Sequence, residues 1–364
     1  MTTQSVHSFV VGTLNKLGLK EEEVTKFQTG GPDGDLGSNE ILMSKDKTIA
    51  IVDGSGVVYD PKGLNREELV RLAKARKMIS SFDTAVLSPG GFRVLITDTD
   101  VLLPHGEKVE SGLNFRNEFH LHPLSKADLF VPCGGRPQSV NLNNVKTVIE
   151  KNGVPKWKVI IEGANLFFTQ DARMVMEKAG AVLYKDASAN KGGVTSSSLE
   201  VLAALALTDS EHEQHMQVKD PNNVPAFYQA YVQQIQEIIN NNATLEFECI
   251  WREHQRTGMA RCVLTDKVSE KINSLNDQVA ARLWDNISIR NAVMHKAIPR
   301  KLQEFVALEE ILRRLPENYS RAIFSAWLAA HFIYKNGIEA SDFAFFEFVN
   351  NLLVGDGQKK KEDL

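Results

Sequence analysis

Short apolar segments alternate with helical patterns from about residue 24 to about residue 207, and this alternation then stops. Several of the segments are apolar throughout, as strands buried on both faces of a sheet are. Because parallel strands need long crossover connections, usually helices, the pattern predicts an α/β fold with a Rossmann-like, doubly wound, mostly parallel sheet. The expected strands are Val24–Thr29, Thr48–Asp53, Arg93–Thr97, Asp128–Pro132, Lys158–Glu162 and Ala181–Tyr184.

Helical patterns lie between these strands and continue alone after residue 207, which predicts an all-helical C-terminal region. Asn65 and Glu68 form a capping-box signature at the start of one helix. The helices expected among the strands are Arg66–Phe82, Leu142–Asn152, Gln170–Gly180 and Thr195–Leu207. Those expected after them are Ala226–Asn241, Asp266–Asp285, Arg300–Leu315, Tyr319–Lys335 and Ser341–Leu353.

The same pattern divides the chain into four parts. Residues 1–23 carry a leading helix, about Gln4–Leu17, and residues 24–207 form the expected nucleotide-binding domain. The helical region covers residues 208–354 and opens with a polar stretch, Thr208–Val224, which we expect to be a surface linker. A charged tail at residues 355–364 is expected to be disordered.

Composition excludes several classes of function. The chain has 42 Lys and Arg against 46 Asp and Glu, a net charge of −4, so a nucleic-acid partner is not expected. The longest apolar stretch, Ile323–Tyr334, falls short of the ~20 residues that span a bilayer, so no membrane partner is expected either. Three distant cysteines without a CxxC motif indicate no metal site and a reducing intracellular compartment, with cytoplasm and mitochondrion both open.

A glycine-rich segment follows the first expected strand and precedes a helix. Gly31, Gly34 and Gly37 are spaced GxxGxxG, one residue longer at the front than the usual dinucleotide fingerprint. Glycines let the backbone approach a pyrophosphate, and a helix N-terminus attracts it. A plain tight turn is the alternative, and Asp33 and Asp35 count against an anion site unless they point away from it.

Asp53 ends the second expected strand, 22 positions after Gly31. An acidic residue about 20 positions after the glycines accepts hydrogen bonds from the adenosine ribose hydroxyls in dinucleotide-binding folds. A carboxylate there would repel a 2′-phosphate, so the sequence favours NAD over NADP. The alternative is an aspartate that only stabilises the turn before Gly54.

Two later segments also carry small polar residues after strands. Asn165 follows the expected strand Lys158–Glu162, at the sheet edge where doubly wound folds bind ligands. Asn190 precedes a glycine pair and a hydroxyl-rich helix start, which could hold a carboxylate or a carboxamide. Either asparagine could instead be structural, and Ser197 with Glu200 also fits a plain capping box.

Four strings in this order, TGGPDGDLGSNE, FVPCGGRP, EGANLF and KDASANKGGVTSSS, resemble the large, fungal-type NAD-specific glutamate dehydrogenases. The resemblance covers nearly the whole chain. It implies that Gly31, Gly34 and Gly37 form the dinucleotide loop and that Asp53 is the ribose acid. It further implies that the rest of the cofactor is bordered by Cys133, Gly134, Asn165 and Asn190. The same resemblance implies that Ser197 contacts the side-chain carboxylate of the substrate.

The implied activity is the NAD-dependent oxidative deamination of L-glutamate to 2-oxoglutarate and ammonium, by a homo-oligomer. The family's catalytic lysine and aspartate lie in a glycine-rich segment for which this sequence has no counterpart. It therefore resembles only the C-terminal third or so of such an enzyme, and we expect no catalytic residue in this chain and no turnover by the chain alone. Two alternatives stay open: another amino-acid dehydrogenase of the superfamily, or a non-catalytic NAD-binding module.

Overall fold

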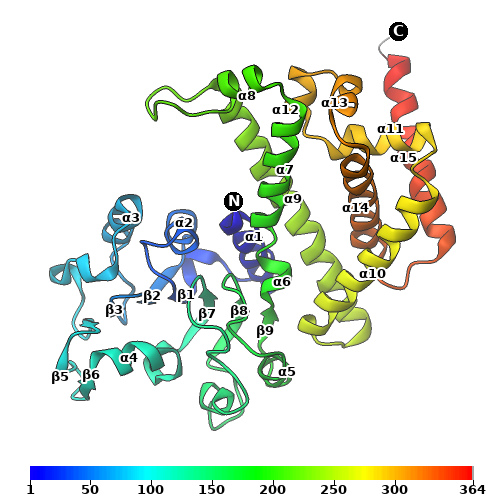
Figure 1. Ribbon diagram of the computed structural model, residues 1–364. Coiled ribbons are helices and arrows are strands. Elements are labelled where there is room, and N and C mark those ends of the chain that lie inside the picture. The colour runs from blue at the N-terminus through cyan, green and yellow to red at the C-terminus, as the bar shows by residue number, and fades with distance from the viewer. Residues whose placement is uncertain (363–364) are drawn as a thin grey trace. The chain divides into compact units, whose positions relative to one another are not determined.

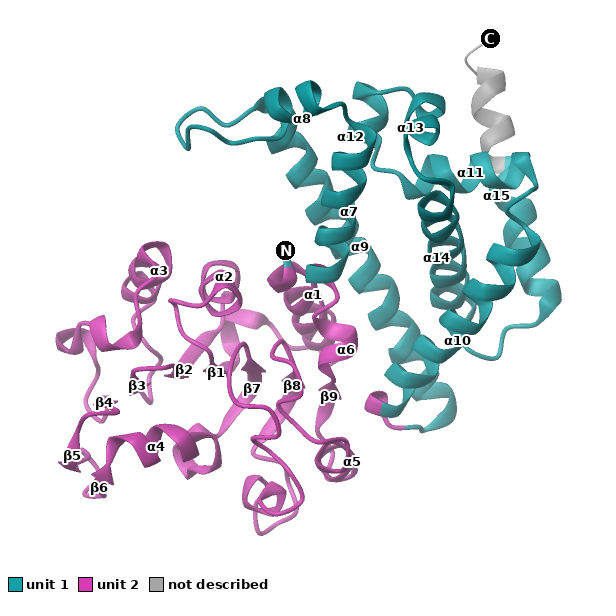
Figure 2. Ribbon diagram, viewed as in Figure 1, with its two compact units in different colours: residues 1, 193–259, 263–364 teal, residues 2–192, 260–262 magenta. Residues whose placement is uncertain are grey.

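The computed structural model describes residues 1–362, with side chains through residue 354. The chain forms two compact units, which Figure 2 colours separately. The strand-rich unit comprises residues 2–192 and 260–262, and the helical unit comprises residue 1, residues 193–259 and the chain from residue 263 onward. The units divide at residue 193, whereas the domain boundary predicted from the sequence is at residue 207.

A seven-stranded sheet in the order β4-β3-β2-β1-β7-β8-β9 forms the centre of the strand-rich unit (Figure 1). The pairs from β2 to β9 in this order are parallel, and the strands β3 and β4 extend the sheet by antiparallel pairing. The strands are β1 (Thr25–Thr29), β2 (Lys47–Val52), β3 (Gly56–Tyr59), β4 (Phe92–Leu95), β7 (Ala127–Pro132), β8 (Trp157–Ile161) and β9 (Val182–Tyr184). A separate hairpin consists of β5 (Thr99–Leu102) and β6 (Lys108–Ser111).

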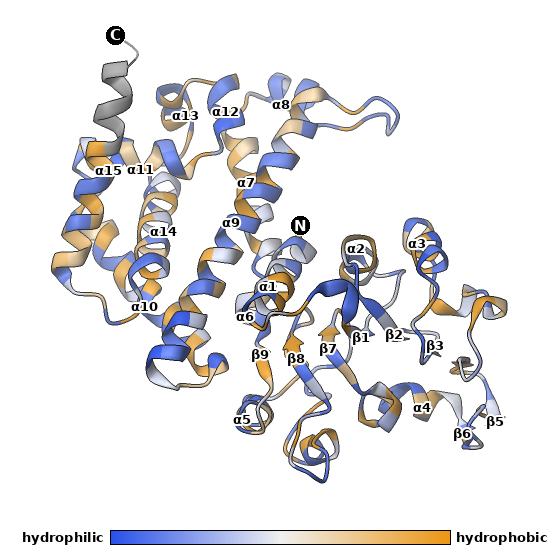
Figure 3. Cartoon of the chain, turned by 180° about the vertical axis from the view of Figure 1, so that it is seen from behind, coloured by the Kyte–Doolittle hydropathy of each residue, from blue (hydrophilic) through white to orange (hydrophobic). Residues whose placement is uncertain are grey.

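The central strands are buried on both faces, as their apolar sequences predict. Figure 3 shows hydrophobic colouring along β7, β8 and β9. Phe27 pairs in register with Phe130 across the β1–β7 ladder, and their rings stack with centroids 4.7 Å apart. The predicted doubly wound α/β fold is therefore confirmed.

Helices cover both faces of this sheet, as two-sided winding requires. In Figure 1, α1, α2 and α3 lie on one side of the sheet and α4 and α5 lie on the other. The chain leaves β1 toward β2 in one direction and β7 toward β8 in the other, so the switch point lies between β1 and β7. The helices are α1 (Thr2–Lys16), α2 (Asp35–Met43), α3 (Arg66–Ala75), α4 (Gly112–Glu118), α5 (Gln170–Lys178) and α6 (Asp186–Ala189).

Three local predictions in this unit were wrong. The short strand β3 was missed, so the expected strand Arg93–Thr97 forms β4 in an antiparallel pair rather than a parallel one. The expected helix Arg66–Phe82 ends at residue 75, because Arg76 is in the left-handed region with φ 50°. The expected helix Leu142–Asn152 contains only a 3-10 turn, Val145–Val148, because side chains of Asn141 and Asn144 bond to local backbone groups in place of helical ones.

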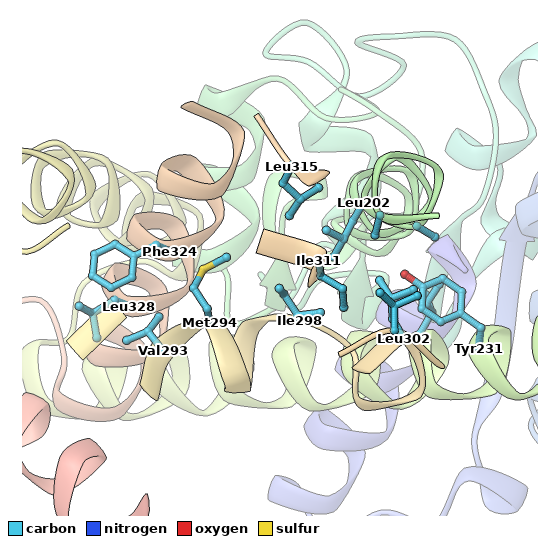
Figure 4. Packing of buried hydrophobic residues seen from close by; sticks show 14 of the residues in the cluster. Leu202, Tyr231, Val293, Met294, Ile298, Leu302, Ile311, Leu315, Phe324 and Leu328 are labelled. Carbon is cyan, nitrogen blue, oxygen red and sulfur yellow. The ribbon is translucent and has the colours of Figure 1, made fainter. Parts of the chain in front are cut away.

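The helical unit is built around an apolar core, part of which is shown in Figure 4. Leu202, Ala203 and Ala206 of α7 are buried in this core, which is why α7 belongs to the helical unit. Its helices are α7 (Gly192–Ala206), α8 (Asp209–His215), α9 (Ala226–Thr257), α10 (Arg261–Arg282), α11 (Ile287–Ala297), α12 (Arg300–Phe305), α13 (Leu308–Arg314), α14 (Glu317–Asn336) and α15 (Asp342–Glu362).

The helices expected after residue 207 are present, but their bounds differ, and the one expected at Ala226–Asn241 extends to Thr257 as α9. The expected linker contains α8, whose start carries a complete capping box of Thr208 and Glu211. The helix α11 was missed, and the expected helix Arg300–Leu315 is two helices because Val306 between them is extended. No helix in the described part of the chain is long and apolar enough to cross a bilayer. The predicted disordered tail at residues 355–364 lies outside the residues whose side chains are described, and it stays a prediction.

Candidate functional site

A glycine-rich turn joins β1 to α2 at the carboxyl edge of the sheet. A Cβ atom on Gly31 would lie 2.5 Å from the Asp53 side chain, and one on Gly37 would lie 2.3 Å from the Gly31 carbonyl oxygen. Gly30 has φ +86°, and a Cβ there would lie 2.5 Å from the Gly134 nitrogen. These positions therefore need glycine so that the turn can pack tightly against two neighbouring loops.

The N-terminus of α2 opens from this turn without a side-chain cap. Gly34 occupies the N-cap position and has no side chain that could accept hydrogen bonds from the first helical N–H groups. Ser38 makes the first helical bond, 2.9 Å long, to the Gly34 carbonyl. A Cβ on Gly34 would meet nothing nearer than 3.7 Å, so its open side borders free space. The uncapped N–H groups and the helix dipole favour an anion at this point.

Side chains of β1 hold the glycine turn and the neighbouring loop in place. The amide nitrogen of Gln28 donates to the carbonyls of Gly30 at 2.8 Å and Gly37 at 3.2 Å, which joins the two ends of the turn. The Thr29 hydroxyl donates to the Gly134 carbonyl at 2.5 Å. Hydrogen bonds from β1 therefore hold both the glycine turn and the loop after β7.

The loop after β7 crosses the turn at the switch point of the sheet. The Cys133 amide donates to the Thr29 carbonyl at 2.6 Å, and a Cβ on Gly134 would lie 3.0 Å from the Gly30 Cα atom. Burial raises the pKa of the Cys133 thiol well above its ordinary value, which keeps it protonated. Cys133 and Gly134 thus contribute backbone shape here.

Asp53 directly follows β2, and both of its carboxylate oxygens accept local hydrogen bonds. Oδ1 accepts from the Ser55 amide at 2.7 Å and its hydroxyl at 2.6 Å, and Oδ2 accepts from the Ile79 amide at 2.7 Å. The side chain is buried, at 4% exposure. Asp53 therefore stabilises the turn that follows it, as the alternative interpretation of the sequence predicted. Its role in binding the ribose stays a prediction.

One of the two acidic residues of the glycine turn, Asp35, has a basic neighbour. Arg76 pairs with Asp35 at 3.1 Å and also donates to the Gly34 carbonyl at 3.1 Å. Both side chains of this pair are exposed, so the attraction between them is weak and screened by salt. Arg76 nevertheless reduces the negative charge that Asp35 adds beside the α2 N-terminus.

These segments enclose a cleft of about 480 Å³. Six of the residues predicted from the sequence line it, namely Gly31, Gly34, Gly37, Asp53, Cys133 and Gly134. The cleft is also lined by residues that the sequence reasoning missed, namely Arg116, Asn117, His120, Arg136, Ser139 and Phe167. Three of these come from the stretch between β6 and β7, where the sequence shows no motif that could have identified them.

Arg116 and His120 line the cleft from the segment between β6 and β7. The Arg116 Nε atom donates to the Asp53 carbonyl at 2.6 Å. His120 Nε2 lies 3.0 Å from the Ser139 carbonyl, which can only accept, so this nitrogen carries the proton. Burial lowers the pKa of His120, so its ring is neutral near neutral pH.

Lys156 fixes the segment that carries His120. Its ammonium group donates to the carbonyls of Leu121 and His122, each at 2.8 Å, and lies 3.3 Å from the Ser125 hydroxyl. Burial lowers the pKa of Lys156 to about 8. Lys156 therefore holds the segment that carries His120 into the cleft.

Asn165 and Asn190 lie together, outside the set of residues that line the cleft. The Asn190 amide nitrogen donates to the Asn165 side-chain oxygen at 2.6 Å and to the Gly163 carbonyl at 3.0 Å. The sequence therefore identified two residues that the fold brings into contact. Their expected position beside the nicotinamide stays a prediction.

A buried charge network supports the Asn165 turn. Arg173 forms two bonds with Glu162, at 2.7 and 2.9 Å, and one with Asp186 at 3.0 Å. Asp186 in turn accepts from the Leu166 amide at 2.8 Å. All three side chains are nearly or fully buried, and burial raises the pKa of Glu162 to about 7, so the two carboxylates depend on Arg173 for their charge.

Ser197 lies within α7, where it cannot cap the helix. The helix begins at residue 192, so Ser197 is in the second turn rather than at the start that the sequence predicted. Its hydroxyl donates to the Gly193 carbonyl at 3.1 Å and is exposed. The capping-box alternative with Glu200 was therefore wrong. The expected substrate contact of Ser197 stays a prediction.

Within the described residues, no group of three or more His, Cys, Asp or Glu side chains could hold a metal ion.

The doubly wound sheet and the glycine cleft at its switch point define a nucleotide-binding type of α/β domain. A family model described as "Glutamate/Leucine/Phenylalanine/Valine dehydrogenase" matches residues 1–258. The chain belongs to this dehydrogenase family, which confirms the resemblance drawn from its motifs.

Individual relatives are similar over almost the whole chain. Glutamate dehydrogenase 2 of Dictyostelium discoideum is 56% identical over 353 residues, which are 97% of this chain and 34% of the relative. The NAD-specific glutamate dehydrogenase of Neurospora crassa is 53% identical over 351 residues, 96% of this chain and 33% of the relative. The chain thus spans about a third of the length of the curated relatives it matches. The solved glutamate dehydrogenase of Plasmodium falciparum is 18% identical with a TM-score of 0.46, over 71% of this chain and 46% of that one.

Proposed function

We propose that the strand-rich unit binds NAD in the glycine cleft and serves the oxidative deamination of L-glutamate. One observation carries the binding proposal: the turn at Gly31–Gly37 has glycine at positions 31, 34 and 37 and leads into an uncapped helix N-terminus, although Asp33 and Asp35 also line the cleft. This is the backbone chemistry that a pyrophosphate requires. The names of the relatives, NAD-specific glutamate dehydrogenases among them, support the choice of cofactor and substrate.

The residues of the cleft fit a dinucleotide. The first N–H groups of α2 would bind the pyrophosphate, which can approach because Gly34 has open space on its outer side. Asp53 would accept from the adenosine ribose through a remaining lone pair, and Arg116 lies on the same side of the cleft. Cys133 and Gly134 would border the other half through their backbone, and Asn165 and Asn190 would bind the carboxamide end.

Bound NAD supplies a hydride acceptor. This chain would hold and orient that acceptor and exclude water from it, which lowers the entropic cost of reaching a reactive geometry. Ser197 would donate to the substrate side-chain carboxylate. We propose no acid or base among the residues that line the cleft.

An oligomer is part of this proposal. A glutamate dehydrogenase of Thermus thermophilus is described as hetero-hexameric, and the relatives are longer chains than this one. Equilibrium sedimentation of the chain, over a range of concentrations, would measure its own state of association. A monomer at all concentrations would contradict the oligomer that we expect.

The proposal is tested by calorimetric titration of the chain with NAD and with NADP. We expect NAD to bind more tightly, and weakly in absolute terms, because closure of an opposing domain normally buries a nicotinamide. A glutamate-dependent NADH assay on the same material should show no turnover. Absence of NAD binding would overturn the proposed cofactor site, and turnover that survives rigorous purification would overturn the expected inactivity of the isolated chain.

A further inference from the structure

A second cleft, of about 550 Å³, lies at the opposite edge of the sheet from the glycine turn. We call it the basic hollow; the polar residues that line it include Ser44, Lys45, Lys47, Lys62 and Arg66. Lys47 begins β2 and Asp53 directly follows its end, so the strand separates the hollow from the dinucleotide cleft by about 20 Å. The two clefts share no lining residue.

The cations of the hollow are poorly compensated. Arg66 donates to the Ser44 carbonyl and approaches the Ser44 hydroxyl at 3.5 Å, and both of these acceptors are neutral. Lys47 and Lys62 are exposed, and neither has an ion pair within the described part of the chain. Lys45 has only a distant partner, Glu22, at 3.8 Å. Like charges gathered around one hollow repel each other unless an anion binds between them.

The acidic group nearest the hollow shares one buried ammonium, that of Lys26, with a second buried carboxylate, Glu40. Asp46 lines the hollow but is buried, and the buried Lys26 ammonium contacts it at 2.8 Å. Lys26 also contacts the Ser44 hydroxyl at 3.0 Å, so Ser44 joins the buried ammonium to the anchored Arg66. The guanidinium is thereby held in a fixed position, which reduces the entropy lost when it binds a ligand.

We propose that the basic hollow is a second ligand site, which binds a chain of phosphoryl groups such as a polyphosphate or the triphosphate of a nucleotide. An Arg fork binds phosphate oxygens in pairs, and flexible lysines add point charges around it. The volume suits a small ligand rather than a macromolecule. The lining contains no aromatic ring on which a base could stack, so the site recognises the phosphates alone.

The test is a calorimetric titration of the 364-residue chain with inorganic tripolyphosphate in saturating NAD, which blocks the glycine cleft. We expect one site, weakened at least about tenfold by the double variant Lys47→Glu and Lys62→Glu. The matched control is the double variant Lys146→Glu and Lys151→Glu, at two exposed lysines outside both clefts, which should change the affinity less than about twofold. Unchanged NAD affinity in the double variant would show that the fold is intact.

Adenosine triphosphate in place of tripolyphosphate distinguishes the source of the phosphates. Since the hollow offers no stacking surface, the two affinities should agree within about threefold. Absence of tripolyphosphate binding, equal losses in the double variant and the control, or a strong preference for the nucleotide would each overturn the proposal. If NAD does not bind, the tripolyphosphate titration is carried out without NAD. It still tests the proposal, because the comparison of the double variant with the control depends on the basic hollow alone.

Discussion

The two units differ in what they bury. The helical unit encloses an almost entirely apolar core, with a few polar exceptions such as Glu246, which accepts from the Tyr334 hydroxyl at 2.7 Å. The strand-rich unit buries many charged side chains, including Lys26, Glu162 and Arg173, close to the segments that form its clefts. Burying a charged side chain costs free energy unless the charge is paired. We infer that the buried charges of the strand-rich unit serve to hold its binding segments in fixed positions.

The largest effect that we expect comes from breaking the buried network of the strand-rich unit. Arg173→Met should lower the free energy of unfolding by about 3–5 kcal/mol, because Glu162 and Asp186 would lose their shared partner. The matched change in the helical unit, Tyr334→Phe, should cost only about 1 kcal/mol. Urea unfolding of both variants measures the difference, and equal losses would remove the contrast between the two units.

Asp53 tests whether one carboxylate serves both the turn and the cofactor. Asp53→Ser should cost about 1–3 kcal/mol of stability, since the Ile79 and Ser55 amides would lose their acceptor. It should also narrow the preference for NAD over NADP by at least about tenfold, or about 1.4 kcal/mol. Denaturation and paired titrations measure the two effects. A stability loss with an unchanged affinity ratio would leave Asp53 with its turn role alone.

Two histidines, the buried His120 and the half-buried His331, lie in different units and allow a comparison by pH. Burial lowers the pKa of both His120 and His331 below the ordinary 6.5. The unfolded chain therefore binds more protons than the folded chain as pH falls below about 6.5, and stability is lost in that direction. His120→Gln and His331→Gln should each make the stability profile flatter below pH 6.5. Only the change at His120 should alter the pH dependence of NAD affinity, and an equal effect of His331→Gln would contradict this assignment.

Ser197→Ala should have the smallest effect on stability. The hydroxyl is exposed and bonds to Gly193 within its own helix, so the free energy of unfolding should change by less than about 0.5 kcal/mol. NAD affinity should also be unchanged. In a protein that turns over glutamate, the same change should raise KM or lower kcat/KM by about 1–3 kcal/mol equivalent, because the contact that we propose is with the substrate. Unchanged kinetics would remove Ser197 from the site.

The parts of the fold that the sequence predicted well are those governed by local chemistry. The continuous apolar run at Val159–Ile161 favours a buried strand, and the glycines after Thr29 favour a tight turn. The sequence therefore predicted both β8 and the glycine turn of the cleft. The missed parts depend on contacts distant in sequence. Arg116 enters the cleft only because α4 brings it to the Asp53 carbonyl, 63 residues away, and no local pattern signals this contact.

The errors around α7 and at the expected helix Leu142–Asn152 have a similar cause. The signature Ser197–Glu200 fits a cap by spacing, yet α7 starts five residues earlier, at Gly192, and its apolar residues pack into the helical core. The asparagines at 141 and 144 bond to nearby backbone and replace an expected helix. In both cases a competing hydrogen-bond or packing arrangement outweighs the local preference.

The central claim is that the glycine turn and the uncapped α2 N-terminus bind the pyrophosphate of NAD, and Gly34→Ala tests it most directly. An added methyl group meets no protein atom nearer than 3.7 Å, and the backbone there, φ −78° and ψ 153°, suits alanine. Stability should therefore change by less than about 1 kcal/mol. NAD affinity, measured by calorimetry, should fall at least about tenfold because the methyl group occupies the space that the pyrophosphate needs. Full NAD affinity in a stably folded Gly34→Ala variant would contradict the account.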